Sequence, residues 1–211
     1  SITIGVFVQL FNGYTRFQFD VYLIDMGFTW VSMIFIAVLS IFIHVLVNNK
    51  YLGYFVIIAY LLFQEFVLES AWEVHHNLLL FGGYSGYTYS DMNGFGPAVA
   101  GTVWFRIYWL LFCGLLSLVA ILLWVRGKET KLTQRLEIAQ QRFTPTMRSI
   151  AIGIAGIWLL VGGFIFYNTN ILNDYINPEV AEERQAEYER QYKQYESVAQ
   201  PRITSAKYFI D

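Results

Sequence analysis

The chain has 211 residues, of which 56% are hydrophobic, 18% aromatic and only 14% charged. Ordinary soluble domains carry about 25% charged residues. This composition therefore excludes an ordinary soluble domain and indicates a chain embedded in a lipid bilayer. A formal net charge of −2 gives no basic field for nucleic acid, and the single cysteine, Cys113, excludes a disulfide framework.

The first apolar segment, residues 1–11, is too short to cross a bilayer, because a crossing takes about 20 helical residues. We interpret it as the end of a preceding transmembrane helix, with an interfacial helix as the alternative. Residues 12–27 are then expected to form a connection outside the membrane.

Four further segments have the length and composition of full transmembrane helices, since backbone groups have no water to bind within lipid. They cover residues 28–47, 51–69, 102–125 and 149–167. Only three residues separate the first two, so these form a tight hairpin. The last carries clustered alanines and glycines in AIGIAGIWLLVGG, which indicates close packing with another helix of this chain or of a second copy. The fold class is therefore an all-α polytopic membrane protein, with residues 28–167 as its transmembrane permease-like domain.

The distribution of Lys and Arg predicts the orientation, because short loops rich in these residues stay in the cytoplasm. Six cations and only two acidic residues lie in residues 126–148, whereas residues 51–105 hold no Lys or Arg. We therefore expect residues 126–148 inside, and residues 70–101 and 168 onward outside. The six cations are Arg126, Lys128, Lys131, Arg135, Arg142 and Arg148.

The cytoplasmic connection contains a predicted amphipathic helix. Leu132, Leu136, Ala139 and Phe143 recur at the spacing of one helix face, with arginines elsewhere around the helix. Two interpretations remain open: a coupling element contacted by a cytoplasmic partner, or an interfacial helix held by anionic lipid.

Polar residues at the outer end of the second span form the one candidate site. If the helix continues past Leu68, four of them share one face at i, i+4, i+8 and i+11. Ionisable groups at this depth indicate a proton or metal site, but the His-x-x-x-His pair of a zinc helix is missing, and the alternative is a stripe that reaches water. The four residues are Glu65, Glu69, Glu73 and His76. The following GGYSGYTYSDMNGFGP predicts a re-entrant or surface-packed loop.

A stalk helix is predicted within residues 168–200, after the last span. Asn177 suits the N-cap and Pro178 the first helical position, and Tyr188, Tyr192 and Tyr195 fall on one side. Residues 201–211 then alternate with period two, and a strand needs partners, so we expect the first strand of a following extracytoplasmic domain.

Several short segments resemble a bacterial family in which the permease of an ABC exporter is fused to an aminopeptidase N-like zinc metallopeptidase. They are VNNKYLGYF, YSDMNGFGP, RFTPTMR, YNTNILNDY and YKQYESVAQPRIT, and the resemblance covers most of residues 12–211. It implies the inner membrane of a bacterium, a second permease half or a homodimer, and a zinc site in a following domain. The family's His-Glu-x-x-His motif has no match in these residues, so no catalytic residue is carried over.

Three functions follow as hypotheses, and the first two place the chemistry outside these residues. The first is an export permease moved by a separate cytoplasmic ABC ATPase, because the sequence has no phosphate-binding loop of its own. The second is a membrane anchor and sensor for the fused peptidase, without transport. A third is an intramembrane enzyme or ion site at the acidic stripe.

Overall fold

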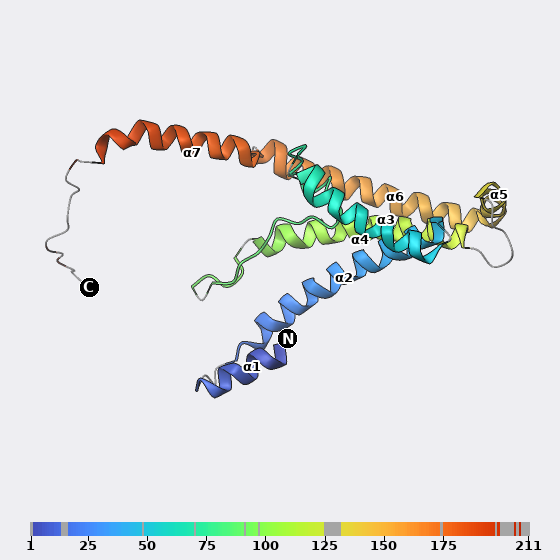
Figure 1. Cartoon of the computed structure of the whole chain (residues 1–211), viewed down its shortest axis with the longest axis horizontal. Helices are drawn as coiled ribbons and strands as arrows, with labels where there is room; N and C mark the ends of the chain where they lie inside the picture. Colours follow the sequence, from blue (N-terminus) through green and yellow to red (C-terminus); the bar gives the residue numbers. More distant parts are fainter. Residues whose placement is uncertain are drawn as a thin grey trace. The chain divides into compact units, whose positions relative to one another are not determined.

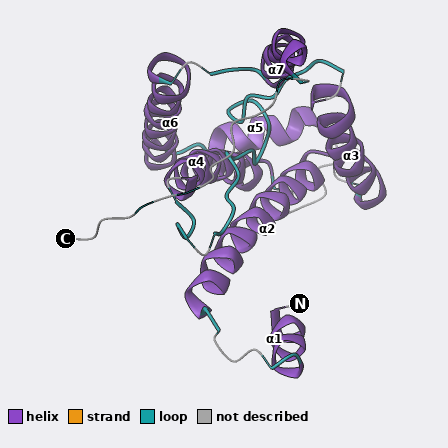
Figure 2. Cartoon of the chain, turned by 90° about the vertical axis from the view of Figure 1, so that its left-hand side faces the viewer, coloured by secondary structure: helices purple, strands orange, loops and turns teal. Residues whose placement is uncertain are grey.

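The computed structural model describes residues 2–13, 17–47, 49–69, 71–90, 92–96, 98–124, 132–173, 175–196, 198, 205 and 207. Four helices in these residues are long and apolar enough to cross a membrane, and no strand occurs in the described ranges (Figure 1, Figure 2). The prediction of an all-α, multi-pass membrane protein is confirmed. The chain divides into two compact units, residues 1–174 and 175–211.

The first unit begins with α1 (Ile2–Phe11) and α2 (Phe19–Val47). The prediction of a connection over residues 12–27 is wrong for its second half, because α2 begins nine residues before Phe28. At 29 residues α2 is about 44 Å long and exceeds a hydrocarbon core of about 30 Å. Its first turns carry two acidic residues, which lowered the hydropathy of the sequence there without ending the helix. The origin of α1 in a preceding span stays a prediction.

The predicted hairpin joins α2 to α3 (Lys50–Phe63), which continues as the π-helix η1 (Gln64–Glu69). Asn49 caps α3, because its Oδ1 accepts hydrogen bonds from two backbone N–H groups of the first turn, at 3.0 and 3.3 Å. The two helices cross closely at Gly53, where an added Cβ would lie 2.6 Å from the ring of His44.

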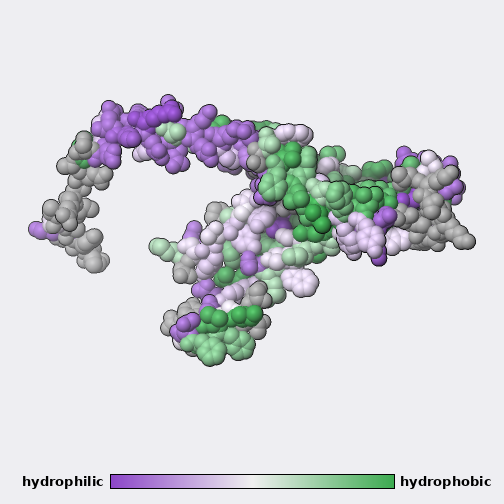
Figure 3. Space-filling model, viewed as in Figure 1, coloured by the Kyte–Doolittle hydropathy of each residue, from purple (hydrophilic) through white to green (hydrophobic). Residues whose placement is uncertain are grey.

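The central helix of the first unit is α4 (Ala98–Leu123), which packs against both α2 and α6 (Pro145–Phe166). Cys113 is buried in the core between them, as small core filler. The buried members of this core are Phe35, Phe105, Tyr108, Trp109, Cys113 and Ile165. Large apolar side chains elsewhere on the spanning helices are exposed, as lipid contact requires, and Figure 3 shows this hydrophobic surface.

Close packing at a small residue is found on α6. An added Cβ at Gly162 would lie 3.0 Å from the ring of Tyr108, so the glycine lets α6 approach α4. The same test at Gly153, Gly156 and Gly163 meets no atom within 4 Å. The helical path of α6 continues as a second π-helix, η2 (Tyr167–Leu172).

The predicted amphipathic helix is present as α5 (Leu132–Arg142). The side chains that it buries against the bundle are Arg135, 3% exposed, and Ala139, 9% exposed. Leu136 and Phe143, part of the predicted apolar face, are 54% and 43% exposed. The arginine side of α5 thus faces the protein, and much of its apolar side is open.

The second unit contains α7 (Pro178–Tyr192) followed by a 3-10 turn (Lys193–Tyr195). Asn177 and Pro178 precede and begin the helix as predicted, but the Asn177 side chain makes no capping hydrogen bond. The rings of Tyr188, Tyr192 and Tyr195 follow one another at 4.4 and 6.2 Å, which confirms the predicted tyrosine side. Figure 3 shows α7 as hydrophilic along its length.

The predicted stalk over residues 168–200 is interrupted, since η2 ends at Leu172 and α7 begins at Pro178. The predicted strand at residues 201–211 lies outside the described residues except for Ser205 and Lys207. It stays a prediction.

Candidate functional site

Between η1 and α4 the chain turns back into the bundle as a non-helical stretch, residues 75–84, which we call the re-entrant segment. Trp109 of α4 donates a hydrogen bond from Nε1 to the carbonyl of Asn77 at 3.2 Å. Trp109 lies 11 residues after Ala98, about 16 Å along α4. Because the 26 residues of α4 make a helix about 39 Å long, the segment packs well inside the length of α4 and not at its end. The loop predicted to be re-entrant or surface-packed, residues 82–97, overlaps this segment only at residues 82–84, and its place in a membrane stays a prediction.

Irregular backbone at this depth needs partners inside the protein, because lipid offers none. Three carbonyls of the re-entrant segment accept hydrogen bonds from side chains of neighbouring helices. Besides the bond from Trp109, Tyr108 donates to Leu78 at 3.5 Å and Gln64 Nε2 donates to Phe81 at 3.4 Å. Two tight turns pair further backbone groups within the segment, at 2.9 and 2.8 Å.

The side chains of the segment complete this packing. Leu80 is 5% exposed, and the ring of Phe81 lies edge-on to Trp109 and Phe112, with centroid distances of 5.2 and 6.1 Å. Gly83 makes the tight turn possible, since an added Cβ would lie 2.9 Å from the carbonyl oxygen of Leu80. The segment is thus packed against α4, with Leu80 as its buried side chain.

The two π-helices hold opposite parts of the re-entrant segment. Gln64 of η1 binds the Phe81 carbonyl, and Asn170 Oδ1 of η2 lies 2.9 Å from Nε2 of His76. A π-helix is uncommon and often marks a functional site, because its wider turn redirects side chains that an α-helix would point elsewhere. Here each π-helix directs one amide side chain onto the segment.

The four residues predicted as an acidic stripe do not lie on one helix in the structure. They are Glu65, Glu69, Glu73 and His76. The helical path ends with η1 at Glu69, and Glu73 has a φ of 54°, in the left-handed region. His76 lies in the re-entrant segment instead. The predicted single stripe is therefore wrong, because the chain leaves the helix before its third member. No group of three His, Cys, Asp or Glu side chains suited to a metal occurs in the ranges that the structure describes.

A polar cleft of about 300 Å³ opens beside the re-entrant segment. Glu69 is the member of the predicted stripe that lines it, together with Gln64, His75 and Asn77. Tyr84, at the end of the segment, forms part of the wall. The cleft thus joins η1 and the re-entrant segment around groups that accept and donate hydrogen bonds.

Arg106 is buried within α4, with only 5% of its side chain exposed. Its Nη1 donates to Ser32 Oγ at 2.7 Å, which joins α4 to α2. Its guanidinium carbon lies 4.3 Å from the ring centroid of Tyr84 and 5.5 Å from that of Phe35. Aromatic faces attract a cation, so these rings partly replace water around the charge.

Arg106 was not predicted as a candidate from the sequence, although the signal was present. It is the one Lys or Arg inside the four predicted spans. An ionisable residue at that depth is costly and therefore points to function. The Lys and Arg residues of the loops predicted the orientation, and the single cation within a span was not considered as a functional residue.

Polar groups after the re-entrant segment fasten the loop to α2 and α4. The hydroxyl of Tyr87 donates to Asp25 Oδ1 at 2.9 Å. Thr102, fully buried, donates to the carbonyl of Gly86 at 3.2 Å and lies 3.3 Å from Ser85 Oγ. This loop therefore stays close to Arg106 on the side of Tyr84.

Tyr87 lies outside the four spanning helices, and its pKa is raised from 10.0 to about 12, mainly by burial and next by its hydrogen bond to Asp25. The neutral phenol is therefore favoured in the folded protein. Its contribution to stability should be complete below pH 10 and be lost as the pH rises through about 12. An ultraviolet titration of tyrosinate, taken as the difference between the native chain and Tyr87→Phe, should show this late ionisation. Asp25→Asn should lower the Tyr87 pKa part of the way toward 10.0, and an unchanged value would contradict the contribution assigned to Asp25.

At the opposite end of α4, arginines of α5 bind the ends of two spanning helices. Arg135 donates through Nε and Nη2 to the carbonyl of Leu123, at 3.3 and 2.9 Å, and through Nη1 to that of Leu46 at 3.2 Å. Its Nη2 also donates to the carbonyl of Val45. Arg142 donates to the carbonyl of Trp124 at 2.7 Å. The last carbonyls of a helix lack internal partners and carry partial negative charge, so these guanidinium groups cap α2 and α4 together.

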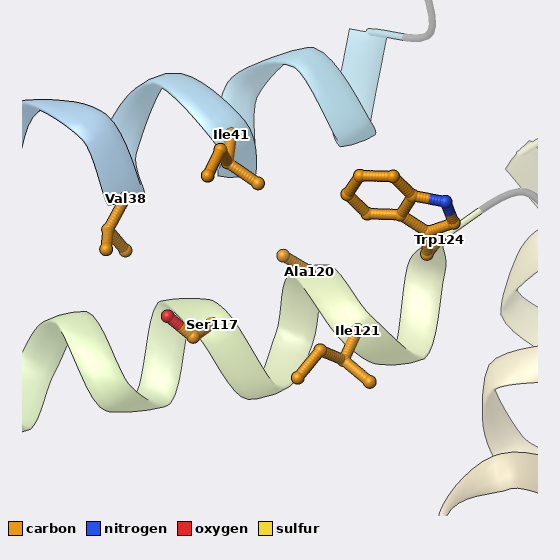
Figure 4. A pocket seen from close by; sticks show the side chains of 6 residues that line it. All are labelled: Val38, Ile41, Ser117, Ala120, Ile121 and Trp124. Carbon is orange, nitrogen blue, oxygen red and sulfur yellow. The ribbon is translucent and has the colours of Figure 1, made fainter.

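An apolar groove of about 200 Å³ lies between α2 and α4 toward this end (Figure 4). Val38 and Ile41 come from α2, and the remaining lining comes from α4 and the residue after it: Ser117, Ala120, Ile121 and Trp124. Ile41, Ile121 and Trp124 are about half exposed, so the groove opens to the surface. Its composition suits lipid chains or a further helix.

No protein-family model, curated protein or solved structure matches this chain. The function is therefore inferred from the geometry of the described residues and from the resemblance of the short segments.

Proposed function

We propose that the chain is the membrane-spanning part of an export permease driven by a separate cytoplasmic ATPase of the ABC type. The re-entrant segment is the observation that carries this proposal. A plain anchor needs only continuous helices, whereas broken backbone at membrane depth is typical of channels and transporters, where it lines the path or the binding site. The polar cleft beside the segment supports a transport role.

The clamp between α5 and the bundle supports coupling to a cytoplasmic motor. Arg135 binds the final carbonyls of α2 and α4, so a displacement of α5 would move both helix ends. Leu136 and Phe143, on the open side of α5, offer a partner an apolar contact. ATP would be bound and hydrolysed by that partner, and the chain would transmit the motion.

The location and the larger context belong to the same proposal. The cations of residues 126–148 support a cytoplasmic position for α5 and an extracytoplasmic one for the re-entrant segment and α7. The resemblance supports the inner membrane of a bacterium, a second permease half or a second copy, and a following domain with a zinc peptidase site.

The test is purification of the native protein from its own membranes, followed by a search for a bound nucleotide-binding subunit. We expect the subunit to copurify, and its ATPase activity to rise several-fold when the membrane protein is present in liposomes. Leu136→Ser combined with Phe143→Ser should abolish that rise, whereas Glu137→Ala, an exposed change on the same helix, should preserve it.

Two other outcomes would decide against the proposal. If no nucleotide-binding subunit copurifies while peptidase activity is present, the anchor and sensor function replaces transport. If the combined variant Leu136→Ser and Phe143→Ser still stimulates the ATPase as the native chain does, the coupling role assigned to α5 is wrong.

A further inference from the structure

The charge of Arg106 has no anionic partner in the part of the chain that the structure describes. Its described contacts are the hydroxyl of Ser32 and the rings of Tyr84 and Phe35. Its Nε is buried and has no hydrogen-bond partner there. Asp25, an acidic residue on the same side of the bundle, is bonded by Tyr87.

An uncompensated guanidinium in this position is unfavourable. Removing a charge from water costs several kcal/mol even after relaxation, and one hydroxyl and two rings offset only part of that cost. A purely structural role at this place would be served by an apolar residue of similar volume, which would carry no such cost. The free Nε and the positive charge indicate that a partner completes the site.

The geometry of the group defines that partner's chemistry. A guanidinium presents parallel N–H donors whose spacing matches two oxygens of a carboxylate or a phosphate, and such bidentate bonds are among the strongest in proteins. Neutral polar ligands would leave the charge uncompensated. An oxyanion satisfies both the charge and the buried Nε.

Tyr84 provides a route to the site. Its ring stands over the Arg106 guanidinium, and the same residue lines the polar cleft of about 300 Å³. Tyr84 is 39% exposed, so part of its ring is open on the cleft side. Rotation of this one side chain would open Arg106 to the cleft.

We propose that Arg106 is the binding site for the oxyanion group, a carboxylate or a phosphate, of a ligand that enters beside Tyr84. The shared chemistry allows two sources: the headgroup of an anionic lipid or a water-soluble acid. The site stands on the burial and contacts of Arg106, and it holds whether or not the chain is a permease.

The experiment measures the thermal unfolding midpoint of the protein in neutral detergent micelles by circular dichroism. One arm adds phosphatidylglycerol, with phosphatidylcholine as its reference. The other arm adds acetate or inorganic phosphate at constant ionic strength. A ligand that binds the folded state raises the midpoint, so we expect a rise of several degrees in one arm, and that arm identifies the source.

Variants of Arg106 connect the rise to this residue. Arg106→Gln and Arg106→Met should abolish it, and Arg106→Lys should weaken probe binding at least tenfold because the fork is lost. Arg148→Gln, which removes an exposed cation of α6, should preserve it. Without added probe, Arg106→Met should unfold at a temperature no lower than the native chain, because the uncompensated charge is gone.

Three results overturn the proposal. The first is that no added oxyanion raises the midpoint of the native chain in either arm. The second is that the rise persists in Arg106→Gln, which would place the binding elsewhere. The third is that neither Arg106→Gln nor Arg106→Met folds, which would make the guanidinium a structural group.

Discussion

Arg135→Ala is expected to lower the free energy of unfolding by about 3 kcal/mol, because one side chain satisfies carbonyls at the ends of two helices. Its guanidinium donates to Leu123 of α4 and to Val45 and Leu46 of α2, and it is only 3% exposed. Hydrogen bonds from a charged donor contribute about 1.5–3 kcal/mol each, and water can replace part of that at a helix end. Alanine also leaves α5 without its main attachment.

Urea unfolding in mixed micelles, followed by circular dichroism, would measure this loss. Arg135→Lys should recover only part of it, since an ammonium cannot bind three carbonyls in the geometry of the fork. Arg148→Ala, an exposed cation on α6, serves as the matched control and should change the free energy by less than about 0.5 kcal/mol. A loss of the same size in both alanine variants would show that charge, and not the capping contacts, matters.

The spanning helices could be predicted from the sequence because the bilayer imposes a length and a composition on them. The extent of the second span was predicted closely, since residues 51–69 were expected and the helical path covers Lys50–Glu69. The start of α2 was missed because hydropathy locates the most apolar stretch, whereas a helix can continue beyond that stretch, and α2 begins at Phe19.

The arrangement around the re-entrant segment could not be predicted in the same way. A π-helix shifts hydrogen bonds from i+4 to i+5 over one turn, and no spacing of apolar residues predicts that shift. The four-residue stripe assumed an unbroken α-helix past Leu68, and it was lost when the path ended at Glu69. The depth of the segment depends on partners distant in sequence, such as Trp109 and Asn170.

The face of α5 that packs against the protein could not be predicted from the sequence, for a different reason. Periodicity predicted its helix and its apolar face correctly, because both are local properties. Which face packs against the protein depends on where unpaired carbonyls are exposed, and these belong to α2 and α4. Arg135 is therefore buried while Leu136 is exposed, the reverse of the usual order for a soluble helix.

Trp109→Phe should destabilise the protein by about 2 kcal/mol, even though the side chain stays aromatic. The change removes the Nε1 donor and leaves the partly buried carbonyl of Asn77 without this bond, and an acceptor that loses its partner costs about 1–3 kcal/mol. Gln64 and Tyr108 would still hold neighbouring carbonyls, so the segment should loosen rather than leave the bundle. Faster hydrogen exchange at residues 75–84 would report that loosening directly.

The chain contains a matched control for this prediction in Trp158 of α6. Its Nε1 is buried and has no hydrogen-bond partner in the described ranges, and its ring stacks on Tyr108 at 5.3 Å. Trp158→Phe removes a donor that is already unsatisfied, so stability should stay unchanged or rise slightly. The two variants delete the same atoms from one aromatic core. If both lower the free energy of unfolding equally, ring volume rather than the bond to Asn77 holds the re-entrant segment in place.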